Sequence, residues 1–275
     1  MLLTQLSTLS HPERMRVFRL LMRRYPGAVP AGEVAQVLDL KPSTTSVYLG
    51  ALAKAGLIVQ DRAGNSLRYT VNMDGAQEMV GSLFVDCCNG RPDLCPPGTV
   101  DPMPRSATMP DTKHNVLFIC TGNSARSIFA EAIMRHEAPD SFTVYSGGTK
   151  PSSELNPVAV EMLEQKGIDT SDLRAKHIGE FQGADAPVMD FVFTVCDLAA
   201  NEECPAWEGQ PISAHWGLPD PVKATGTDAE KRLAFQQTFG AMRNRILAFA
   251  ALPLDTLSRA SLQHEVDEIG RKKED

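Results

Sequence analysis

A proline-rich segment, residues 96–113, divides this chain into two parts that have to fold separately. It holds five prolines in eighteen residues and shows almost no apolar periodicity, a composition that predicts a semi-extended linker. The parts on either side, 1–95 and 114–275, are each long enough to bury a modest core. We therefore expect two domains joined by this linker.

The two parts differ in charge. Residues 1–75 carry nine Lys and Arg against five Asp and Glu, a net of +4, whereas residues 101–275 carry 17 against 26, a net of -9. Such an asymmetry indicates domains with different partners. No apolar run is long enough to span a bilayer, and the first residues lack the order of a signal peptide. We therefore expect a cytoplasmic protein that does not bind a membrane.

The first part has the pattern of a winged helix. A helix is expected to begin near Pro12, with apolar residues at helical spacing behind it. Residues 31–40 predict a second helix, and a third restarts at Lys41-Pro42-Ser43. Residues 57–72 alternate as two strands around a turn at 63–65. We therefore expect a mainly α winged helix-turn-helix domain with a β-hairpin wing.

The second part alternates strands with helices. Such alternation predicts an α/β three-layer domain, with a parallel sheet and helices on both faces. A last stretch, 254–269, has apolar residues at near-helical spacing and is expected to pack on this domain. The expected strands are 115–119, 142–145 and 191–195, and the expected helices are 127–136, 156–166 and 228–249.

A cysteine loop joins the first of these strands to its helix. Cys120 is followed by five residues and then by Arg126 and Ser127. The backbone N–H groups of such a loop converge on one concavity, and the helix dipole adds positive potential there, so a tetrahedral oxyanion fits. Arg126 would bind two oxygens of this oxyanion. The helix dipole and the Ser127 hydroxyl would favour a Cys120 thiolate, which attacks the central atom of the oxyanion. The expected oxyanion-binding residues are Thr121, Gly122, Asn123, Ser124, Ala125 and Arg126.

This loop resembles that of the low-molecular-weight phosphotyrosine phosphatase superfamily. The resemblance covers about residues 114–250 and rests on Cys120, Arg126 and Ser127 between a strand and a helix. It implies that Asp220, in Leu218-Pro219-Asp220-Pro221, is a general acid that protonates the leaving oxygen.

Two further cysteines, Cys196 and Cys204, follow the third expected strand. Here the sequence is similar to arsenate reductases of the thiol-relay type. The resemblance implies that arsenate forms an adduct on Cys120, that Cys196 expels arsenite from it, and that Cys204 closes the final disulfide. Thioredoxin would then reduce that disulfide, and no tightly bound cofactor is expected. The cysteine spacing is one residue longer than in the thioredoxin-coupled pattern, which leaves glutathione or mycothiol open as the reductant.

A phosphatase remains the alternative reading of the second part, because phosphate and arsenate are near-isosteres. The chain would then be a DNA-binding regulator fused to a low-molecular-weight protein tyrosine phosphatase. Asp220-Pro221 is followed by Val222-Lys223-Ala224, which offers no aromatic wall for a phosphotyrosyl ring. We interpret Trp207 and Trp216 as core residues. A third hypothesis, a metal-binding interaction module with an inactive loop, is disfavoured by the complete Cys, Arg, Ser and Asp set.

Residues 31–57 and the hairpin after them resemble the ArsR/SmtB family of metal-responsive repressors. The resemblance covers about residues 1–80 and implies a homodimer through this domain, reading a near-palindromic operator. Arg62 and Arg68 on the wing would contact phosphates or the minor groove. A winged helix used for protein contact is the alternative. The residues implied to face the major groove from the recognition helix are Ser43, Thr44, Thr45, Ser46 and Tyr48.

Three cysteines, Cys87, Cys88 and Cys95, follow the wing within nine residues. Arsenite takes three thiolates in a pyramid, whereas zinc takes four ligands. The nearest histidine, His114, lies beyond the proline-rich segment. The cluster therefore predicts an arsenite site, formed within one chain or shared with a neighbouring one, and arsenite as the effector of the repressor.

Overall fold

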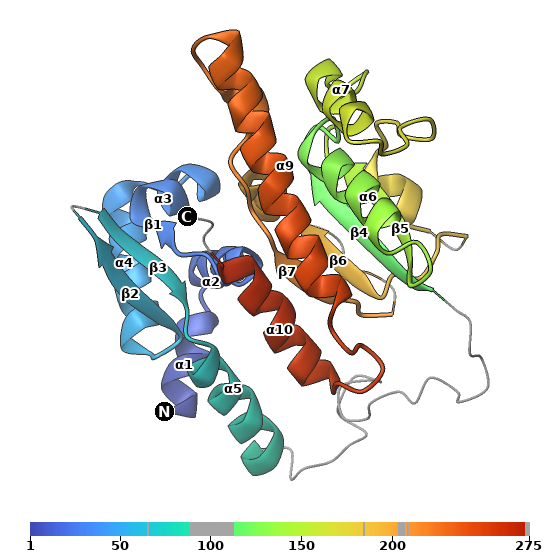
Figure 1. The fold of residues 1–275 in the computed structure, drawn as a ribbon. Helices are drawn as coiled ribbons and strands as arrows, with labels where there is room; N and C mark the ends of the chain where they lie inside the picture. Colours follow the sequence, from blue (N-terminus) through green and yellow to red (C-terminus); the bar gives the residue numbers. More distant parts are fainter. Residues whose placement is uncertain (65, 88–112, 184, 203–206, 208, 273–275) are drawn as a thin grey trace. The chain divides into compact units, whose positions relative to one another are not determined.

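The computed structural model describes residues 1–64, 66–87, 113–183, 185–202, 207 and 209–272. The chain forms two compact units, Met1–Ala107 and Thr108–Asp275 (Figure 1). Of the expected linker 96–113, only Lys113 lies within the described residues. Each unit has its own hydrophobic core, and each is described separately below.

The N-terminal unit contains helices and a small antiparallel sheet of order β1-β3-β2. A π-helical turn, Leu83–Cys87, follows the last helix. Its elements are α1 Leu2–Leu9, α2 Pro12–Arg24, β1 Val29–Pro30, α3 Ala31–Leu38, α4 Pro42–Lys54, β2 Ile58–Ala63, β3 Ser66–Val71 and α5 Met73–Ser82.

Local sequence signals explain where these helices begin. Helix α2 starts at Pro12, whose fixed φ suits the first helical position, and the His11 ring accepts the Glu13 N–H. Helix α4 likewise has Pro42 as its first residue. Helices α2 and α4 bury leucines in one core, where α2 packs on α4 and β3 and α4 packs on β2. Helices α3 and α4 with the β2–β3 hairpin thus form the expected winged helix.

The C-terminal unit contains a four-stranded parallel sheet of order β5-β4-β6-β7. Single turns of 3-10 helix lie at Ile178–Phe181 and Pro221–Lys223. Its elements are β4 His114–Cys120, α6 Arg126–Glu137, β5 Phe142–Gly148, α7 Pro157–Gln165, β6 Phe191–Thr194, α8 Asp197–Asn201, β7 Ile212–His215, α9 Asp228–Ala250 and α10 Arg259–Arg271.

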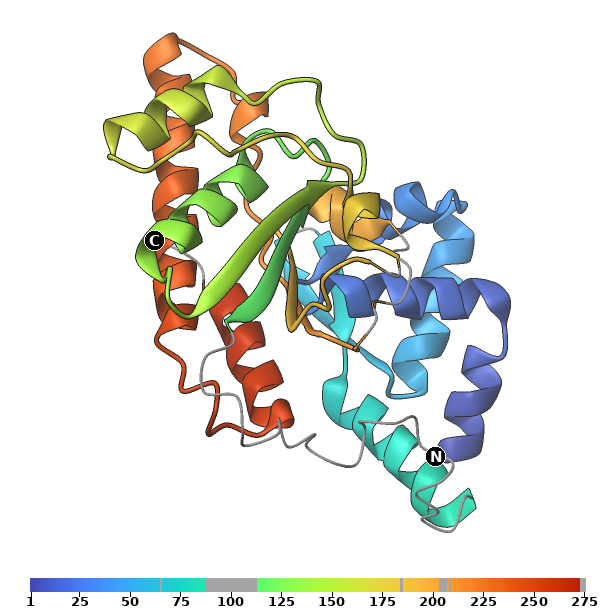
Figure 2. The ribbon, with the colours of Figure 1, turned by 90° about the vertical axis from the view of Figure 1, so that its right-hand side faces the viewer.

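Helices cover both faces of this sheet. Figure 2 shows α6, α9 and α10 on one side of it and α8 on the other. Helix α6 packs on α9 through the Phe129 ring, which meets Phe235 and Phe239 edge-on. The Trp216 ring stacks on Phe193 at 4.0 Å between centroids and is fully buried, as expected for a core residue. This packing fixes β4 and α6, the two elements that flank the cysteine loop.

Several elements were not expected from the sequence. Strand β7 is short and has an exposed Ser213, so it lacks the apolar run that marks β4 and β6. Helices α1 and α5 flank the residues 12–72 for which the sequence predicted individual elements. Helix α10 occupies the expected last stretch and packs on β7, where the Trp216 Nε1–H donates to Val266 O at 2.9 Å.

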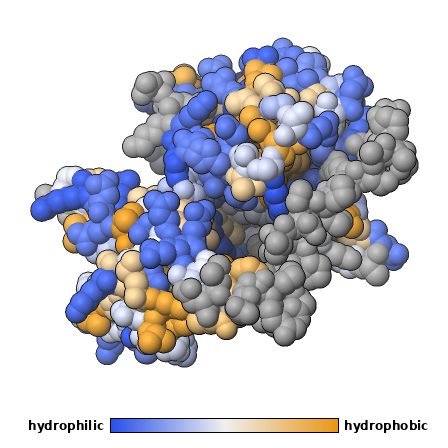
Figure 3. Space-filling view, turned by 90° about the horizontal axis from the view of Figure 1, so that it is seen from below, coloured by the Kyte–Doolittle hydropathy of each residue, from blue (hydrophilic) through white to orange (hydrophobic). Residues whose placement is uncertain are grey.

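Within the described residues, no helix is long and apolar enough to cross a membrane. The face shown in Figure 3 carries apolar residues in small groups among hydrophilic ones.

Candidate active site and DNA-binding surface

The loop between β4 and α6 is held from outside by the segment after β5. N–H groups of that segment donate to four loop carbonyls: Thr149 to Cys120 at 3.1 Å, Lys150 to Thr121 at 2.9 Å, Ser152 to Gly122 at 2.8 Å and Asn156 to Ser124 at 2.9 Å. In a trans peptide the N–H points opposite to the carbonyl of the same plane. The N–H groups of residues 121, 122, 123 and 125 are therefore turned to the other side of the loop, as an anion cradle requires.

The loop needs one unusual backbone conformation and one close approach. Asn123 has a φ of 43°, in the left-handed region that few side chains favour. A Cβ at Gly148, the last residue of β5, would lie 2.6 Å from the Thr121 carbonyl oxygen. Glycine at 148 is thus required for the loop to lie against β5.

Cys120 lies at the base of this loop and is buried. Its Sγ is 2.9 Å from Ser127 Oγ and accepts the Asn123 N–H at 3.1 Å. Burial raises the pKa of the Cys120 thiol, the hydrogen bonds from Ser127 and Asn123 lower it in part, and the nearby Cys196 raises it further. The expected contact with Ser127 is present. The expected preference for the thiolate stays a prediction, which burial opposes and the hydrogen bonds from Ser127 and Asn123 favour.

Arg126 and Asp220 lie together beside the loop. The Arg126 Nη2 is 2.8 Å from Asp220 Oδ2, and its Nη1 donates to Leu218 O at 3.1 Å. Asp220 precedes a 3-10 turn, and its Oδ1 accepts the Val222 N–H at 3.3 Å. The structure thus brings the candidate anion-binding cation and the candidate general acid into one place.

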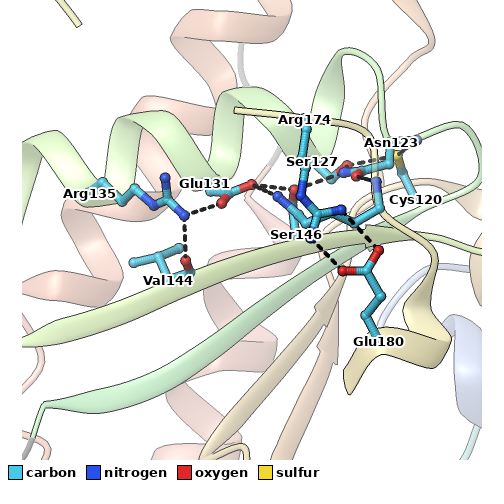
Figure 4. A network of polar contacts seen from close by, with 10 residues as sticks. Cys120, Asn123, Ser127, Glu131, Arg135, Val144, Ser146, Arg174 and Glu180 are labelled. Carbon is cyan, nitrogen blue, oxygen red and sulfur yellow. Dashed lines mark hydrogen bonds and ion pairs between the residues drawn. The ribbon is translucent and has the colours of Figure 1, made fainter. Parts of the chain in front are cut away.

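A chain of buried polar contacts continues from the loop into the core (Figure 4). The Asn123 Nδ2 donates to both Ser127 Oγ and Ser146 Oγ at 2.8 Å. Ser146 then donates to Glu131 Oε2 at 2.5 Å, and Lys176 Nζ is 2.8 Å from the same oxygen. Glu131 is fully buried, and Arg135 also pairs with it. Asn123, the loop residue with positive φ, is therefore linked through Ser146 to the buried ion pair of Glu131 and Lys176.

These supporting residues were missed by reasoning from the sequence alone. Ser146 and Lys176 give no signal there, since they lie far along the chain. Glu131 does give one: it is the single charge within the apolar run 128–134 of helix α6. A charge among residues that must be buried predicts a buried partner.

Cys196 lies beside the loop as well. It is 1% exposed, caps the N-terminus of α8, and its Sγ is 3.5 Å from Thr121 Oγ1. A second buried thiol is thus adjacent to the loop that carries Cys120. The other expected relay cysteine, Cys204, lies outside the described residues.

In the N-terminal unit, helix α4 presents part of the expected DNA-binding set. Ser43 and Ser46 are exposed, and Thr44 is half-buried. The expectation for Thr45 is wrong, because this residue is 1% exposed and its hydroxyl donates inward to Lys41 O. Val47, which was not expected, is 67% exposed on the same outer face.

The structure also describes Tyr48, Arg62 and Arg68, the other residues of the expected DNA-binding set. The Tyr48 ring is half-buried, with its centroid 5.0 Å from that of His11. Arg62 and Arg68 are exposed, one on each strand of the wing. In the antiparallel register of these strands, Asp61 lies opposite Arg68 and Arg62 lies opposite Leu67.

Of the candidate arsenite ligands, Cys87 is exposed at the end of the π-helical turn. Cys88 and Cys95 lie outside the described residues. Among the residues that the structure does describe, no group of three or more His, Cys, Asp or Glu could hold a metal ion.

Comparison with known proteins finds two families. Residues 115–266 match the low molecular weight phosphotyrosine protein phosphatase family, and residues 9–61 match a helix-turn-helix domain. Among curated proteins, an arsenate reductase of Shouchella clausii is 39% identical over 141 residues, 50% of this chain and 96% of its own length. An arsenate reductase of Bacillus subtilis is 36% identical over 138 residues, 49% of this chain and 94% of its own length.

A solved structure described as an arsenate reductase in the phosphate binding state is also similar. It is 29% identical, covers 50% of this chain and 97% of its own, and has a TM-score of 0.42.

Proposed function

Because the chain belongs to the low molecular weight phosphotyrosine protein phosphatase family and carries a helix-turn-helix domain before it, we propose that it is a bifunctional arsenic-resistance protein. Its C-terminal unit would reduce arsenate to arsenite, and its N-terminal unit would be an arsenite-responsive repressor. The observation that carries the reductase proposal is the buried Cys196 thiol beside the Cys120 loop, 3.5 Å from Thr121 Oγ1. Hydrolysis of a phosphate ester needs no second thiol.

In the first step, arsenate binds to the N–H groups of the loop and to Arg126. The Cys120 sulfur forms a bond to arsenic, and an arsenate oxygen leaves as water. Two protons are needed for that water. One is the proton of the Cys120 sulfhydryl group, and the other comes with the bound hydrogen arsenate. In this proposal Asp220, 2.8 Å from Arg126, passes the sulfhydryl proton to the leaving oxygen.

In the second step, the Cys196 sulfur attacks the Cys120 sulfur of the adduct. An S–S bond forms and the S–As bond breaks, and its electron pair stays on arsenic, which goes from As(V) to As(III) and departs as arsenite. Cys204 then attacks Cys196, forms the Cys196–Cys204 disulfide and releases Cys120 as a thiolate, which regains a proton. An external dithiol completes the cycle. We propose thioredoxin, with glutathione or mycothiol as the alternatives.

The reductase is tested by arsenate-dependent NADPH consumption with thioredoxin and its reductase, beside an aryl phosphatase assay on the same sample. We expect arsenate turnover, and only slow aryl phosphate hydrolysis, since phosphate occupies the same cradle. Phosphatase turnover far above arsenate reduction would instead support the second candidate, a tyrosine phosphatase. The contact of Arg126 with Asp220 serves both reactions, so it does not distinguish them.

For the N-terminal unit, we propose that α4 enters the major groove of operator DNA. Ser43, Ser46 and Val47 lie on its exposed face and offer two hydroxyls and an apolar group to base edges. Arg62 and Arg68 on the wing would contact phosphates.

A second copy of this chain is the partner that we propose for helices α1 and α5. Gln5 Nε2 donates to Gly75 O, which joins the two helices. Leu3 on α1 is 81% exposed and Val80 on α5 is 59% exposed, and both are apolar side chains that a dimer would bury. Sedimentation of a Leu3→Glu, Val80→Glu double variant should show monomers where the wild-type protein shows dimers.

Arsenite, and not arsenate, should release this dimer from DNA by binding Cys87, Cys88 and Cys95. Arsenate is an oxyanion that thiolates do not ligate until it is reduced. A coupling of about 1–3 kcal/mol would suffice for a useful response. Replacing all three cysteines by serine should give a repressor that arsenite cannot release. Release of that variant at the same arsenite concentration would place the sensing site elsewhere.

A further inference from the structure

His215, the last residue of β7, joins two residues that flank Cys196. Its Nδ1 is 2.9 Å from Thr194 Oγ1, at the end of β6, and its Nε2 is 3.0 Å from Asp197 Oδ1, the first residue of α8. The imidazole is 6% exposed. One neutral ring satisfies both contacts, with Nε2–H donating to the carboxylate and Nδ1 accepting from the hydroxyl. His215 therefore bridges the strand-to-helix turn that carries Cys196.

The end of β7, which carries His215, is fixed by contacts of the next two residues. The next residue, Trp216, donates its N–H to Thr194 O at 2.7 Å and stacks on Phe193. A Cβ at Gly217 would lie 2.5 Å from His215 Nε2 and 2.7 Å from Asp197 Oδ1. The backbone thus passes directly over the contact between His215 and Asp197, and glycine leaves room for it.

Cys120 is positioned by different residues. Its sulfur contacts Ser127 and Asn123, and the loop carbonyls accept N–H groups of the segment 149–156. Within the described part of the chain, those contacts do not pass through the His215 ring. The Cys196 sulfur meets the Cys120 loop at Thr121 Oγ1, 3.5 Å away, whereas the His215 contacts lie on the Cys196 side alone. We therefore expect that the turn with Cys196 can be disturbed while the anion loop keeps its own contacts.

We propose that His215 is a positioning residue for Cys196 and controls the step that expels arsenite, without contributing to anion binding. This inference rests on the proposed reductase function. The attacking sulfur has to approach the Cys120 sulfur along one line, and a misplacement of about 1 Å can cost about a hundred-fold in rate. Loss of the bridge between Thr194 and Asp197 would leave the turn with Cys196 free to shift.

Asp197 offers the cleanest variant, because its side chain is 57% exposed and its loss creates no buried cavity. Asp197→Ala removes the contact with Nε2, whereas Asp197→Asn keeps a hydrogen-bonding oxygen and removes only the charge. His215→Gln tests the ring itself. Ser213→Ala, an exposed position on the same strand, is the matched control.

The first measurement is a single turnover of arsenate without reductant, beside binding of inorganic phosphate by calorimetry. We expect Asp197→Ala and His215→Gln to release arsenite about ten-fold or more slowly, with an unchanged Kd for phosphate. Asp197→Asn and Ser213→Ala should behave as the wild type does. Unchanged arsenite release in Asp197→Ala, or an equal loss of phosphate binding, would overturn the inference.

The second measurement does not depend on arsenate. N-ethylmaleimide should modify Cys196 faster in Asp197→Ala than in the wild type, while Cys120 reacts at the same rate in both, as read by mass spectrometry. Equal rates at Cys196 would overturn the positioning role. A wild-type protein that releases no arsenite would instead refute the reductase function, and the alkylation rates would still decide whether His215 holds Cys196.

Discussion

The anion loop before α6 and the start of α4 are both turns that lead into a helix N-terminus, where backbone N–H groups favour a negative charge. They are held in place very differently. The loop is fixed on its outer side by the segment 149–156 and on its inner side by Asn123, Ser146 and the buried Glu131. The start of α4 has local contacts, such as Ser46 Oγ to Pro42 O at 3.0 Å.

The difference follows from the size of the proposed ligands. A small oxyanion cannot organise a loop around itself, so the protein has to fix the loop beforehand through buried contacts. DNA presents its own regular shape, and a helix with exposed short side chains is sufficient to meet it. Substitutions in the loop and its supports should therefore have larger effects than substitutions on α4.

The largest effect should come from Cys120→Ser, which removes the nucleophile of the proposed reductase. We expect arsenate reduction to fall to background while operator binding stays unchanged, because the two activities use different units. The NADPH-coupled assay and a gel-shift titration on the same preparation check this. Arsenate turnover at the wild-type rate would mean that another residue is the nucleophile.

The next largest effect should come from Lys176→Met, which leaves Glu131 buried with one cation fewer. Breaking a buried ion pair typically costs about 3–5 kcal/mol. Trp207 and Trp216 both lie in the C-terminal unit, so tryptophan fluorescence during urea unfolding reports on that unit. Arg232→Ala, which breaks an exposed pair with Glu161, is the control and should leave the midpoint unchanged. Adding Glu131→Gln to Lys176→Met should recover part of the loss.

A smaller effect is expected from Val47→Ala on α4. If Val47 meets a thymine methyl group, its truncation should weaken operator binding by about 1 kcal/mol, near the lower end for a base contact. Non-specific DNA binding should not change. Thr45→Ser, at the buried position beside it, should preserve affinity, because its hydroxyl donates to Lys41 O. If the variants at 47 and 45 have equal effects, a different face of α4 meets the DNA.

The smallest effect is expected from Arg68→Ala on the wing. A phosphate contact carries little sequence information, so specific and non-specific binding should weaken alike. The slope of log K against log salt should fall by about one. An unchanged slope would remove Arg68 from the DNA interface.

The sequence predicted the order of the main elements better than it predicted the residues that support the anion loop. The order of strands and helices around Cys120 followed from apolar runs and turn residues, and the structure confirms the parallel sheet and the winged helix. Strand β7 was missed because four residues with an exposed serine carry no strand signal. Ser146 and Lys176 were missed because only the folded chain brings them to Glu131 and the loop.

Burial accounts for the correction at Thr45 and for the direction of the Cys120 pKa. Thr45 lies in a polar stretch that predicts an exposed hydroxyl, but its position on α4 directs the side chain into the core. The position of Cys120 before a helix favours a thiolate, whereas burial of its side chain acts in the opposite direction and raises its pKa. Sequence patterns locate such residues, whereas their exposure depends on the packing of elements far apart along the chain.

A single turnover of the Cys204→Ser variant tests the relay most directly. The variant keeps Cys120 and Cys196 and lacks the third cysteine, so the reaction should stop at the first disulfide. With stoichiometric arsenate and no reductant, we expect one arsenite per chain and a disulfide between Cys120 and Cys196, identified by peptide mass spectrometry. No arsenite, or arsenite with Cys196 still a free thiol, would contradict the proposed transfer from Cys120 to Cys196.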